Sequence, residues 1–254
     1  EFRISQLLNK DGIYFDYLVT EQVENEEMER YKDVGSNIFK LPIDNEHGLL
    51  IRELKINREY YRFFKNHNYN IVYADNSLRS IHLFMAKLAG VSIRVVHSHN
   101  TGLQTESKTS KIISRVIRNF FVFSATDYFA CSDLAAKWLF PDVIIKKGKY
   151  KLLTNGVDLN AFKFDESIRM RIRKMYNILP TDVVIGNVGR FVPQKNHKFM
   201  LSIFHELLKK MPNAKLMLIG AGPLEDEIKK IVKNYNLNEA VIFVGTTRTV
   251  VDYY

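Results

Sequence analysis

The amino-acid sequence predicts an α/β protein with two doubly wound parallel sheets. Short apolar runs rich in β-branched and aromatic residues alternate with longer stretches of helical period, and this alternation is typical of β-α units stacked on a parallel sheet. The alternation breaks at "LLTNGVDLNAFKFD" (152–165), where Asn-Gly favours a turn, and a new β-α series follows. We therefore assign residues 1–163 to a first domain and residues 164–254 to a second, incomplete domain.

Each domain has its own series of strands and helices. Apolar runs predict strands in the first domain at 13–19, 37–41, 70–74, 93–98, 127–131 and 149–153, and in the second at 183–189, 214–220 and 240–245. Helical period predicts helices at 48–66, 77–89, 108–124, 133–139, 166–177, 196–210 and 223–235. The first residues have helical period and "RTVVDYY" starts another helix, so we interpret the chain as an interior piece of a longer protein.

Composition limits the classes of partner and compartment. The chain has 254 residues, of which 46% are hydrophobic and 26% charged, as in ordinary globular proteins. No apolar stretch reaches the roughly 18 residues of a membrane span. The net charge of +9 favours acidic partners such as phosphate esters, nucleic acid or an anionic membrane face. The single cysteine, Cys131, excludes a disulfide framework, and we interpret it as a buried strand residue. The sequence shows no secretory signal peptide, so we expect a cytoplasmic protein.

Polar residues and glycines follow the predicted strands of both domains. In open α/β sheets, ligands bind outside the carboxyl ends of the strands. If the two domains face each other across a cleft, these residues would line it. In the second domain they are Gly189, Arg190, Gly220, Gly222, Pro223, Gly245, Thr246 and Thr247, and in the first Asp75, Asn76, His97, Ser98, His99, Asn100 and Ser132.

The stretch "GRFVPQKN" (189–196) joins a predicted strand to a predicted helix and contains two cations. A helix start carries partial positive charge, so an unpartnered Lys195 there favours a negatively charged ligand. Gly189 would let the backbone approach a phosphate, and Arg190 together with Lys195 would offset the charge of a diphosphate. The alternative is a pair of solvated surface cations. The sequence contains no Asp-x-Asp pair, which argues against a metal-clamped diphosphate and leaves this role to the two cations.

Three further stretches have both a functional and a structural interpretation. "GAGPLEDE" (220–227) lacks the third glycine of a dinucleotide fingerprint, and Pro223 suits a first helical position. At "HSHN", we expect His97 and His99 to point to opposite faces, so that one of them reaches a shared cleft, whereas a metal site would lack a carboxylate or third histidine. The basic helix 108–121 either lies on an anionic membrane or has a solvated basic face.

These motifs, taken in order, resemble a known enzyme family. "VGRFVPQKNHKFMLSIFHELLKKMPNAKLMLIGAGPLEDEIK" with "VIFVG" is similar to the donor-binding domain of retaining glycosyltransferases of family 4, which have the GT-B fold. "LLTNGVDLNAF", "FACSDLAAKWLF" and "RVVHSHN" resemble the acceptor-side domain of the same enzymes, especially bacterial ones that build capsular polysaccharides and exopolysaccharides. The resemblance therefore implies two Rossmann-like domains, with the first strand of the first domain missing.

The resemblance also implies roles for individual residues. Arg190 and Lys195 correspond to the basic pair that holds the nucleotide diphosphate and stabilises its departure. His99 corresponds to the histidine that contacts the donor sugar, and Gly189 and Gly222 to glycines of close approach. To this nucleotide-binding set we add Gly245 and Thr246, which end the third strand of the second domain.

The implied reaction is the transfer of a sugar from a nucleotide sugar, usually a UDP-sugar, to a glycan or lipid-linked acceptor. The anomeric configuration is retained, and the enzyme would be a hexosyltransferase of class EC 2.4. It would need no cofactor and no metal ion. Its expected location is the cytoplasm or the inner face of the plasma membrane. The family's Gly-rich loop and its Glu-x7-Glu motif are not in this chain, so we expect the 254-residue chain alone to be catalytically impaired.

Two rival hypotheses remain at this point. A sugar-nucleotide epimerase of the same fold would consume the donor without an acceptor. A basic nucleic-acid-binding module would show binding that falls steeply with salt, but the sequence contains no recognised motif for it, and we expect no nucleic-acid partner.

Overall fold

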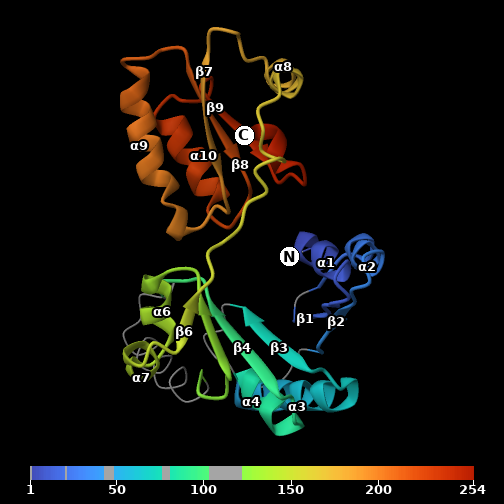
Figure 1. The fold of residues 1–254 in the computed structure, drawn as a ribbon. Coiled ribbons are helices and arrows are strands. Elements are labelled where there is room, and N and C mark those ends of the chain that lie inside the picture. The colour runs from blue at the N-terminus through green and yellow to red at the C-terminus, as the bar shows by residue number, and fades with distance from the viewer. Residues whose placement is uncertain (1, 21, 43–48, 76–80, 103–121) are drawn as a thin grey trace. The chain divides into compact units, whose positions relative to one another are not determined.

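The protein divides into two compact units, Glu1–Asn155 and Gly156–Tyr254. The computed structural model shown in Figure 1 describes residues 2–20, 22–42, 49–75, 81–102 and 122–254. All strand pairings among these residues are parallel, as the alternating pattern predicts. The boundary predicted between residues 163 and 164 lies within the second unit of this division.

The described residues of the first unit form two parallel sheets. Its helices are α1 (Phe2–Asn9), α2 (Asn25–Lys32), α3 (Leu49–His67), α4 (Ile81–Ala89), α6 (Asp133–Leu139) and α7 (Asp142–Lys146). Its strands are β1 (Tyr17–Val19), β2 (Ile38–Lys40), β3 (Ile71–Asp75), β4 (Ile93–Ser98), β5 (Asp127–Ala130) and β6 (Tyr150–Leu152). Strands β1 and β2 form a two-stranded sheet, and the larger sheet has the order β3-β4-β5-β6.

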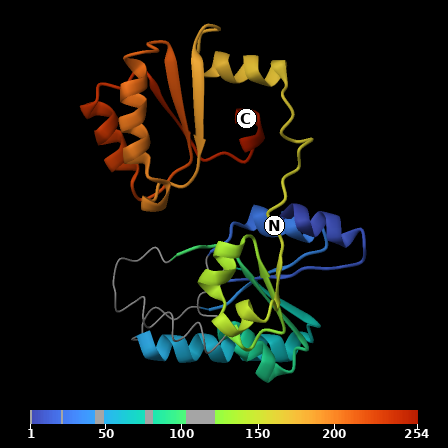
Figure 2. The same cartoon turned by 60° about the vertical axis from the view of Figure 1, so that its left-hand side comes forward.

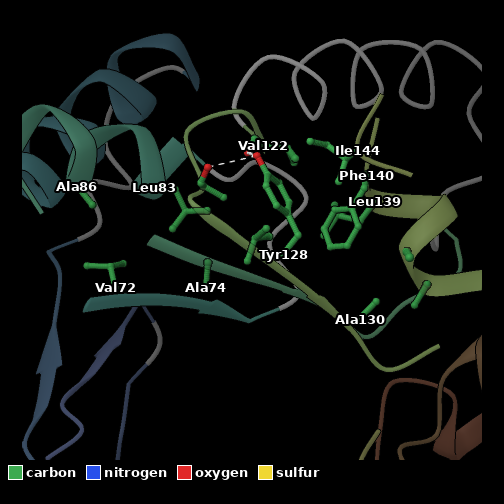
Figure 3. Close-up of a cluster of buried hydrophobic side chains, with 14 of the residues drawn as sticks. Val72, Ala74, Leu83, Ala86, Val122, Tyr128, Ala130, Leu139, Phe140 and Ile144 are labelled. Atoms are coloured by element: carbon green, nitrogen blue, oxygen red, sulfur yellow. Dashed lines mark hydrogen bonds between the residues drawn. The ribbon is translucent and has the colours of Figure 1, made fainter. Parts of the chain in front are cut away.

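The core of the first unit lies between the larger sheet and the helices that follow its strands (Figure 3). Leu83 of α4, Val96 of β4 and Leu139 of α6 are fully buried there. The hydroxyl of Tyr128 is buried among them and donates to the backbone carbonyls of Val122 and residue 125, each 3.2 Å away. This core fixes the ends of β3 and β4, at which the polar residues singled out from the sequence lie.

The second unit is a three-stranded parallel sheet with the order β7-β8-β9. Its strands are β7 (Val183–Val188), β8 (Ala214–Ile219) and β9 (Val241–Gly245). Its helices are α8 (Glu166–Met175), α9 (His197–Leu208) and α10 (Glu225–Asn234), with 3-10 turns η1 (Pro193–Lys195) and η2 (Val250–Tyr253). The helices of the second unit therefore begin and end close to the predicted positions.

Helices cover both faces of this sheet, as Figure 2 shows for α9 and α10 on one face and α8 on the other. The central strand β8 divides its side chains between the two faces. Leu216 and Leu218 pack into the cluster made with α9 and α10, whereas Met217 and Ile219 pack into the cluster made with α8. A strand buried on both faces has a continuous apolar sequence, which explains why "LMLI" (216–219) has no polar alternation.

Several predicted elements differ from the structure. Helices α2 and α7 were not predicted, because α2 buries only Tyr31 and α7 has only five residues, so neither has an extended apolar stripe. The strand predicted from residue 13 begins at Tyr17. The helix predicted at 108–124 falls mostly outside the described residues.

Candidate functional site

The carboxyl ends of β3 and β4 lie side by side in the first unit. The parallel register pairs Asp75, the last residue of β3, with His97 of β4. Because neighbouring parallel strands end at the same edge of a sheet, side chains that are distant in sequence meet there. Asn76, which was also singled out from the sequence, lies outside the described residues.

His97 is buried at this edge, with 4% of its surface exposed. Its Nδ1 atom makes a short hydrogen bond with the hydroxyl of Tyr73 on β3, and no hydrogen bond of normal geometry reaches its Nε2 atom from the described residues. Burial lowers the pKa of His97, and a positive charge on His99 would lower it further. The ring is therefore neutral at pH 7. Burial, followed by the nearby Asp75 carboxylate, raises the pKa of Tyr73 to about 12.

His99 stands directly over His97 and contacts a carboxylate. The Nε2 atom of His99 lies 3.2 Å from Oδ1 of Asp75, and the two side chains are 23% and 47% exposed. The ring centroids of His97 and His99 are 3.8 Å apart. The prediction that these two histidines point to opposite faces is therefore wrong, because residues two positions apart at a strand end share a face.

The other polar residues at this edge have structural partners. Ser98 is fully buried and donates to the backbone carbonyl of Ala135 at 2.8 Å. Ser132 caps α6 by accepting from the backbone N–H of Ala135 at 3.2 Å. Of the polar residues predicted at the end of β4, His99 thus combines partial exposure with an ion-pair partner from another strand.

In the second unit, Lys195 lies next to Gly189. A Cβ added at Gly189 would stand 3.2 Å from Cε and 3.4 Å from Cδ of Lys195, so the lysine stem runs across this glycine. Lys195 ends the turn η1, and Asn196, with φ of 49°, separates it from the first residue of α9. The helix therefore begins one residue later than predicted, and the lysine precedes it.

Arg190 and Lys195 are both exposed at the carboxyl edge of the sheet. Among the described residues, neither forms an ion pair with a carboxylate, although seven other ion pairs are present. Two cations without acidic partners at this edge can neutralise an anion that approaches the strand ends.

The two glycines that follow β8 are required by the packing of the protein's own backbone. Gly220 has φ of 143°, and a Cβ there would stand 2.1 Å from the Gly189 carbonyl oxygen. A Cβ at Gly222 would stand 2.6 Å from the carbonyl oxygen of Phe191. Hydrogen bonds from Phe191 N to Ala221 O (3.0 Å) and from Gly189 N to the carbonyl at 219 (2.9 Å) hold these loops together. The space beside Gly222 is thus filled by Phe191.

Strand β9 ends at the same edge of the second unit's sheet. The Gly245 carbonyl accepts a hydrogen bond from the backbone N–H of Gly220 at 2.8 Å, and Gly245 has φ of 80°, which favours glycine. Thr246 follows it and is exposed. The ends of the second unit's three strands therefore form one edge, with Arg190 and Lys195 as its cations.

His197, the first residue of α9, was not singled out from the sequence. It is 2% exposed, its ring meets Phe191 edge-on at 4.9 Å between centroids, and neither ring nitrogen has a hydrogen-bond partner among the described residues. Burial, and secondarily the positive charge of Lys195, lowers the pKa of His197. A neutral ring therefore packs against Phe191, close to the charge of Lys195.

The chain is similar to several known proteins. Residues 169–254 match the family described as "Glycosyl transferases group 1". This match begins within α8 and runs through η2, and so includes Arg190 and Lys195. Over 94% of the chain, the sequence is 28% identical to EpsF of Bacillus subtilis (strain 168), which is named a glycosyltransferase, and it covers 62% of that protein. It is 26% identical to an Escherichia coli α-1,3-galactosyltransferase over 85% of the chain and 57% of that enzyme. The chain thus spans less than two thirds of either relative.

Solved structures establish the fold class. The structure of Anabaena HepE with UDP-glucose is similar with a TM-score of 0.69 at 15% identity, over 94% of this chain and 71% of that chain. WaaG, a glycosyltransferase involved in lipopolysaccharide biosynthesis, is similar with a TM-score of 0.70 at 13% identity, over 99% of this chain and 66% of that chain. The chain has the GT-B fold, which confirms the fold prediction.

The described part of the chain has neither a metal-binding cluster nor a membrane-spanning helix. No three side chains of His, Cys, Asp or Glu gather there in a group that could hold a metal ion. None of the helices described is both long enough and apolar enough to cross a membrane.

Proposed function

We propose that this chain acts in glycosyl transfer from a nucleotide sugar, with a UDP-sugar as the donor. The observation that carries the proposal is the pair of exposed cations, Arg190 and Lys195, at the carboxyl edge of the second unit's sheet without acidic partners among the described residues. The family match over the same residues supports it. So does the similarity in fold to HepE, whose structures contain UDP and UDP-glucose.

In this proposal, the two cations act on the leaving group. Transfer breaks the bond between the anomeric carbon of the sugar and the β-phosphate oxygen, and the electron pair leaves with the nucleoside diphosphate. The guanidinium of Arg190 and the ammonium of Lys195 stabilise the negative charge that develops on that oxygen. No metal ion is required for this step, because two fixed cations supply the charge. His99 of the first unit contacts the donor sugar.

The acceptor hydroxyl forms the new bond to the anomeric carbon and gives up its proton to the leaving diphosphate. We propose that the new bond forms on the face from which the diphosphate leaves, so that the anomeric configuration is retained. The roles of His99, Arg190 and Lys195 in this scheme, and those of Gly189, Gly222, Gly245 and Thr246 around the nucleotide, are part of the proposal.

The proposed acceptor is a glycan or a lipid-linked saccharide in the synthesis of a bacterial surface polysaccharide. Two relatives support this class by their names. One is CapM of Staphylococcus aureus, a capsular polysaccharide biosynthesis glycosyltransferase that is 26% identical over 54% of the chain. The other is the Escherichia coli enzyme, whose named acceptor is linked to diphosphoundecaprenol. A location at the inner face of the plasma membrane, through the basic segment 108–121, is proposed with it.

Thermal unfolding in the presence of nucleotide sugars tests the proposal. A ligand that binds only the native state raises the apparent stability, by about 2.7 kcal/mol at a concentration one hundred times its Kd. We expect UDP-glucose or another UDP-sugar to raise the unfolding temperature more than GDP- and ADP-sugars do. Arg190→Ala and Lys195→Ala should each weaken UDP binding about tenfold, the typical effect of losing a charge-assisted hydrogen bond.

Lys233→Ala is the matched control, because this exposed lysine lies in the last turn of α10, at the opposite edge of the sheet. Equal UDP binding by the wild-type, Arg190→Ala and Lys195→Ala proteins would contradict the proposal. Transfer to an acceptor, as opposed to consumption of the donor alone, separates a transferase from an epimerase.

A further inference from the structure

Strand β7 has the sequence of an inner strand but lies at the edge of its sheet. It pairs with β8 on one side, and among the described residues no strand pairs with its other side. Its sequence, VVIGNV, contains neither a charged residue nor a proline, which are the residues that protect natural edge strands from unwanted pairing. A nearly continuous apolar run is typical of a parallel strand inside a covered sheet. The sequence of β7 and its position therefore disagree.

An apolar groove of about 270 Å³ lies beside this open edge, between β7 and α9. It is lined by Lys195 and Asn196 and otherwise by apolar side chains, among them Ile185, Phe199, Met200 and Ile203. Phe199 and Ile203 are 60% and 54% exposed, and Ile185 is 37% exposed. Large apolar side chains that gather at one exposed place mark an interaction surface.

The turn η2 lies on the opposite face of the sheet from the groove, next to β7. Tyr253 packs into the cluster made with α8, and its hydroxyl lies 3.2 Å from that of Tyr176. Asp252 forms an ion pair with Arg171 of α8 at 2.8 Å. A Cβ added at Gly186 of β7 would stand 4.0 Å from the carbonyl oxygen of Tyr253. The backbone that leaves β9 has therefore crossed the α8 face of the sheet to β7 (Figure 1).

The face over which the backbone crosses determines where a following parallel strand can lie. Crossovers between parallel strands are right-handed in about 98% of cases. The connections from β7 to β8 and from β8 to β9 contain α9 and α10 and pass over one face. A right-handed connection over the other face must run in the reverse direction, from β9 past β8 and β7. The common doubly wound arrangement likewise places the fourth strand beside the first.

From the open edge, the groove and the course of η2, we infer that the outer edge of β7 is the docking site for one further parallel strand of the same polypeptide, which follows η2 in a longer protein. The chain spans less than two thirds of EpsF and of the Escherichia coli enzyme, so these relatives are long enough to contain such a segment. The docked strand pairs with the backbone of β7, and its apolar side chains fill the groove beside Ile185, Phe199 and Ile203. The inference does not depend on the identity of the donor.

The pairing of β7 with β8 identifies the amides that face the docking site. The N–H groups of Val183 and Gly189 donate to the carbonyls of residues 213 and 219, at 3.1 and 2.9 Å. Successive N–H groups of a strand point to alternate sides. The odd-numbered residues of β7 therefore direct their N–H groups toward β8. The even-numbered residues direct theirs toward the open edge, and these are Val184, Gly186 and Val188.

Hydrogen exchange measured by NMR, residue by residue, tests the inference. It compares this 254-residue chain, at a concentration where sedimentation shows a monomer, with the longer protein. In this chain, we expect the N–H groups of Val184, Gly186 and Val188 to exchange at least about tenfold faster than those of Ile185 and Asn187, because they face the open edge. In the longer protein, all five should exchange slowly, because the docked strand accepts the three outer hydrogen bonds.

Two variants with matched exposure give a second measurement. Ile203→Glu places a charge at the groove, where the side chain is 54% exposed, and Leu88→Glu places the same charge on α4, where it is 55% exposed. In this chain, each should change the unfolding temperature by less than about 2 °C, as is usual for surface substitutions. In the longer protein, Ile203→Glu alone should lower it by about 5 °C or more, because the docked segment buries the new carboxylate.

The inference is overturned if the three outer amides are already protected in the monomeric 254-residue chain, or if they still exchange rapidly in the longer protein. Protection that is lost when a dimer of the longer protein is diluted would assign the edge to a second copy, and would overturn it as well. Equal shifts for Ile203→Glu and Leu88→Glu in the longer protein would show that nothing covers the groove.

Discussion

The side chain of Lys195 lies across Gly189, so closely that a methyl group on residue 189 would stand 3.2 Å from its Cε atom. The lysine is the last residue of the turn η1, yet it forms one surface with the glycine at the end of β7. A small residue at 189 therefore allows the ammonium to lie close to the strand end, where an anionic ligand of an α/β sheet binds.

Substituting Gly189 should alter binding more than stability. In Gly189→Ala the new methyl group pushes aside the flexible end of Lys195, which can move at little energetic cost. We expect UDP affinity to fall about threefold and the free energy of unfolding to change by less than about 1 kcal/mol. Calorimetric titration with UDP and urea unfolding measure the two quantities. Gly156→Ala is the control, because a Cβ there meets no atom within 4 Å. If Gly189→Ala binds UDP as tightly as the wild type does, this account of Lys195 is refuted.

Gly222→Ala, in contrast, should alter stability more than UDP binding. Its Cβ would stand 2.6 Å from the carbonyl oxygen and 2.8 Å from the nitrogen of Phe191, and a backbone segment cannot move aside as a lysine can. We expect a loss of about 1–3 kcal/mol in the stability of the second unit, which is typical of overpacking. Far-UV circular dichroism during urea unfolding measures it. An unchanged midpoint would mean that the loops carrying residues 191 and 222 can separate.

His197 should make the second unit sensitive to acid. Burial lowers its pKa in the folded state, whereas the unfolded chain keeps the ordinary value near 6.5. As pH falls through that value, the unfolded state binds the proton first, so the stabilisation present above it is lost. His197→Leu removes this proton site and suits the apolar contact with Phe191.

We expect the His197→Leu protein to be within about 1.5 kcal/mol of wild type at pH 7.5 and to lose less stability between about pH 7.5 and pH 5. Thermal unfolding at the two pH values checks this. His205→Leu is a control on the same helix, since His205 has a partly exposed ring stacked on Tyr235. An equal acid loss in wild type and His197→Leu would show that other groups account for it.

Tyr128 should contribute to the first unit through its hydroxyl. Tyr128→Phe removes the donor to the carbonyls of Val122 and Ala125 and should reduce stability by about 1 kcal/mol. The only tryptophan in the sequence, Trp138, packs against this core, so its fluorescence during urea unfolding is the measurement. Tyr150→Phe, which removes an exposed hydrogen bond to Asp133, should shift the urea unfolding transition less than Tyr128→Phe does. A larger shift in Tyr150→Phe would contradict the assignment of the Tyr128 hydroxyl to the core.

Much of the fold could be predicted from the sequence because local pattern determines it. The runs 93–98 and 133–139 match β4 and α6 in both bounds. The first contains the buried pair Val95 and Val96, and Ser132 caps the second. By contrast, α2 buries a single residue, Tyr31, so periodicity gives no signal for it. Six of its eight residues are charged or Asn, and packing rather than sequence pattern decides their conformation.

The candidate site could be predicted in part. The rule that ligands bind at strand ends identified Gly189, Arg190 and His99 without a structure. The contact between Asp75 and His99 could not be predicted in the same way, because it depends on the register between β3 and β4. The burial of His197 was also not predictable, since a histidine at a helix start has no pattern that distinguishes a buried ring from an exposed one.

A crystal structure of this chain with bound UDP tests the central claim most directly. The account predicts diphosphate oxygens within hydrogen-bond distance, about 2.7–3.2 Å, of both the Arg190 guanidinium and the Lys195 ammonium, without a metal ion between them. A bound UDP from which both side chains point away would contradict it.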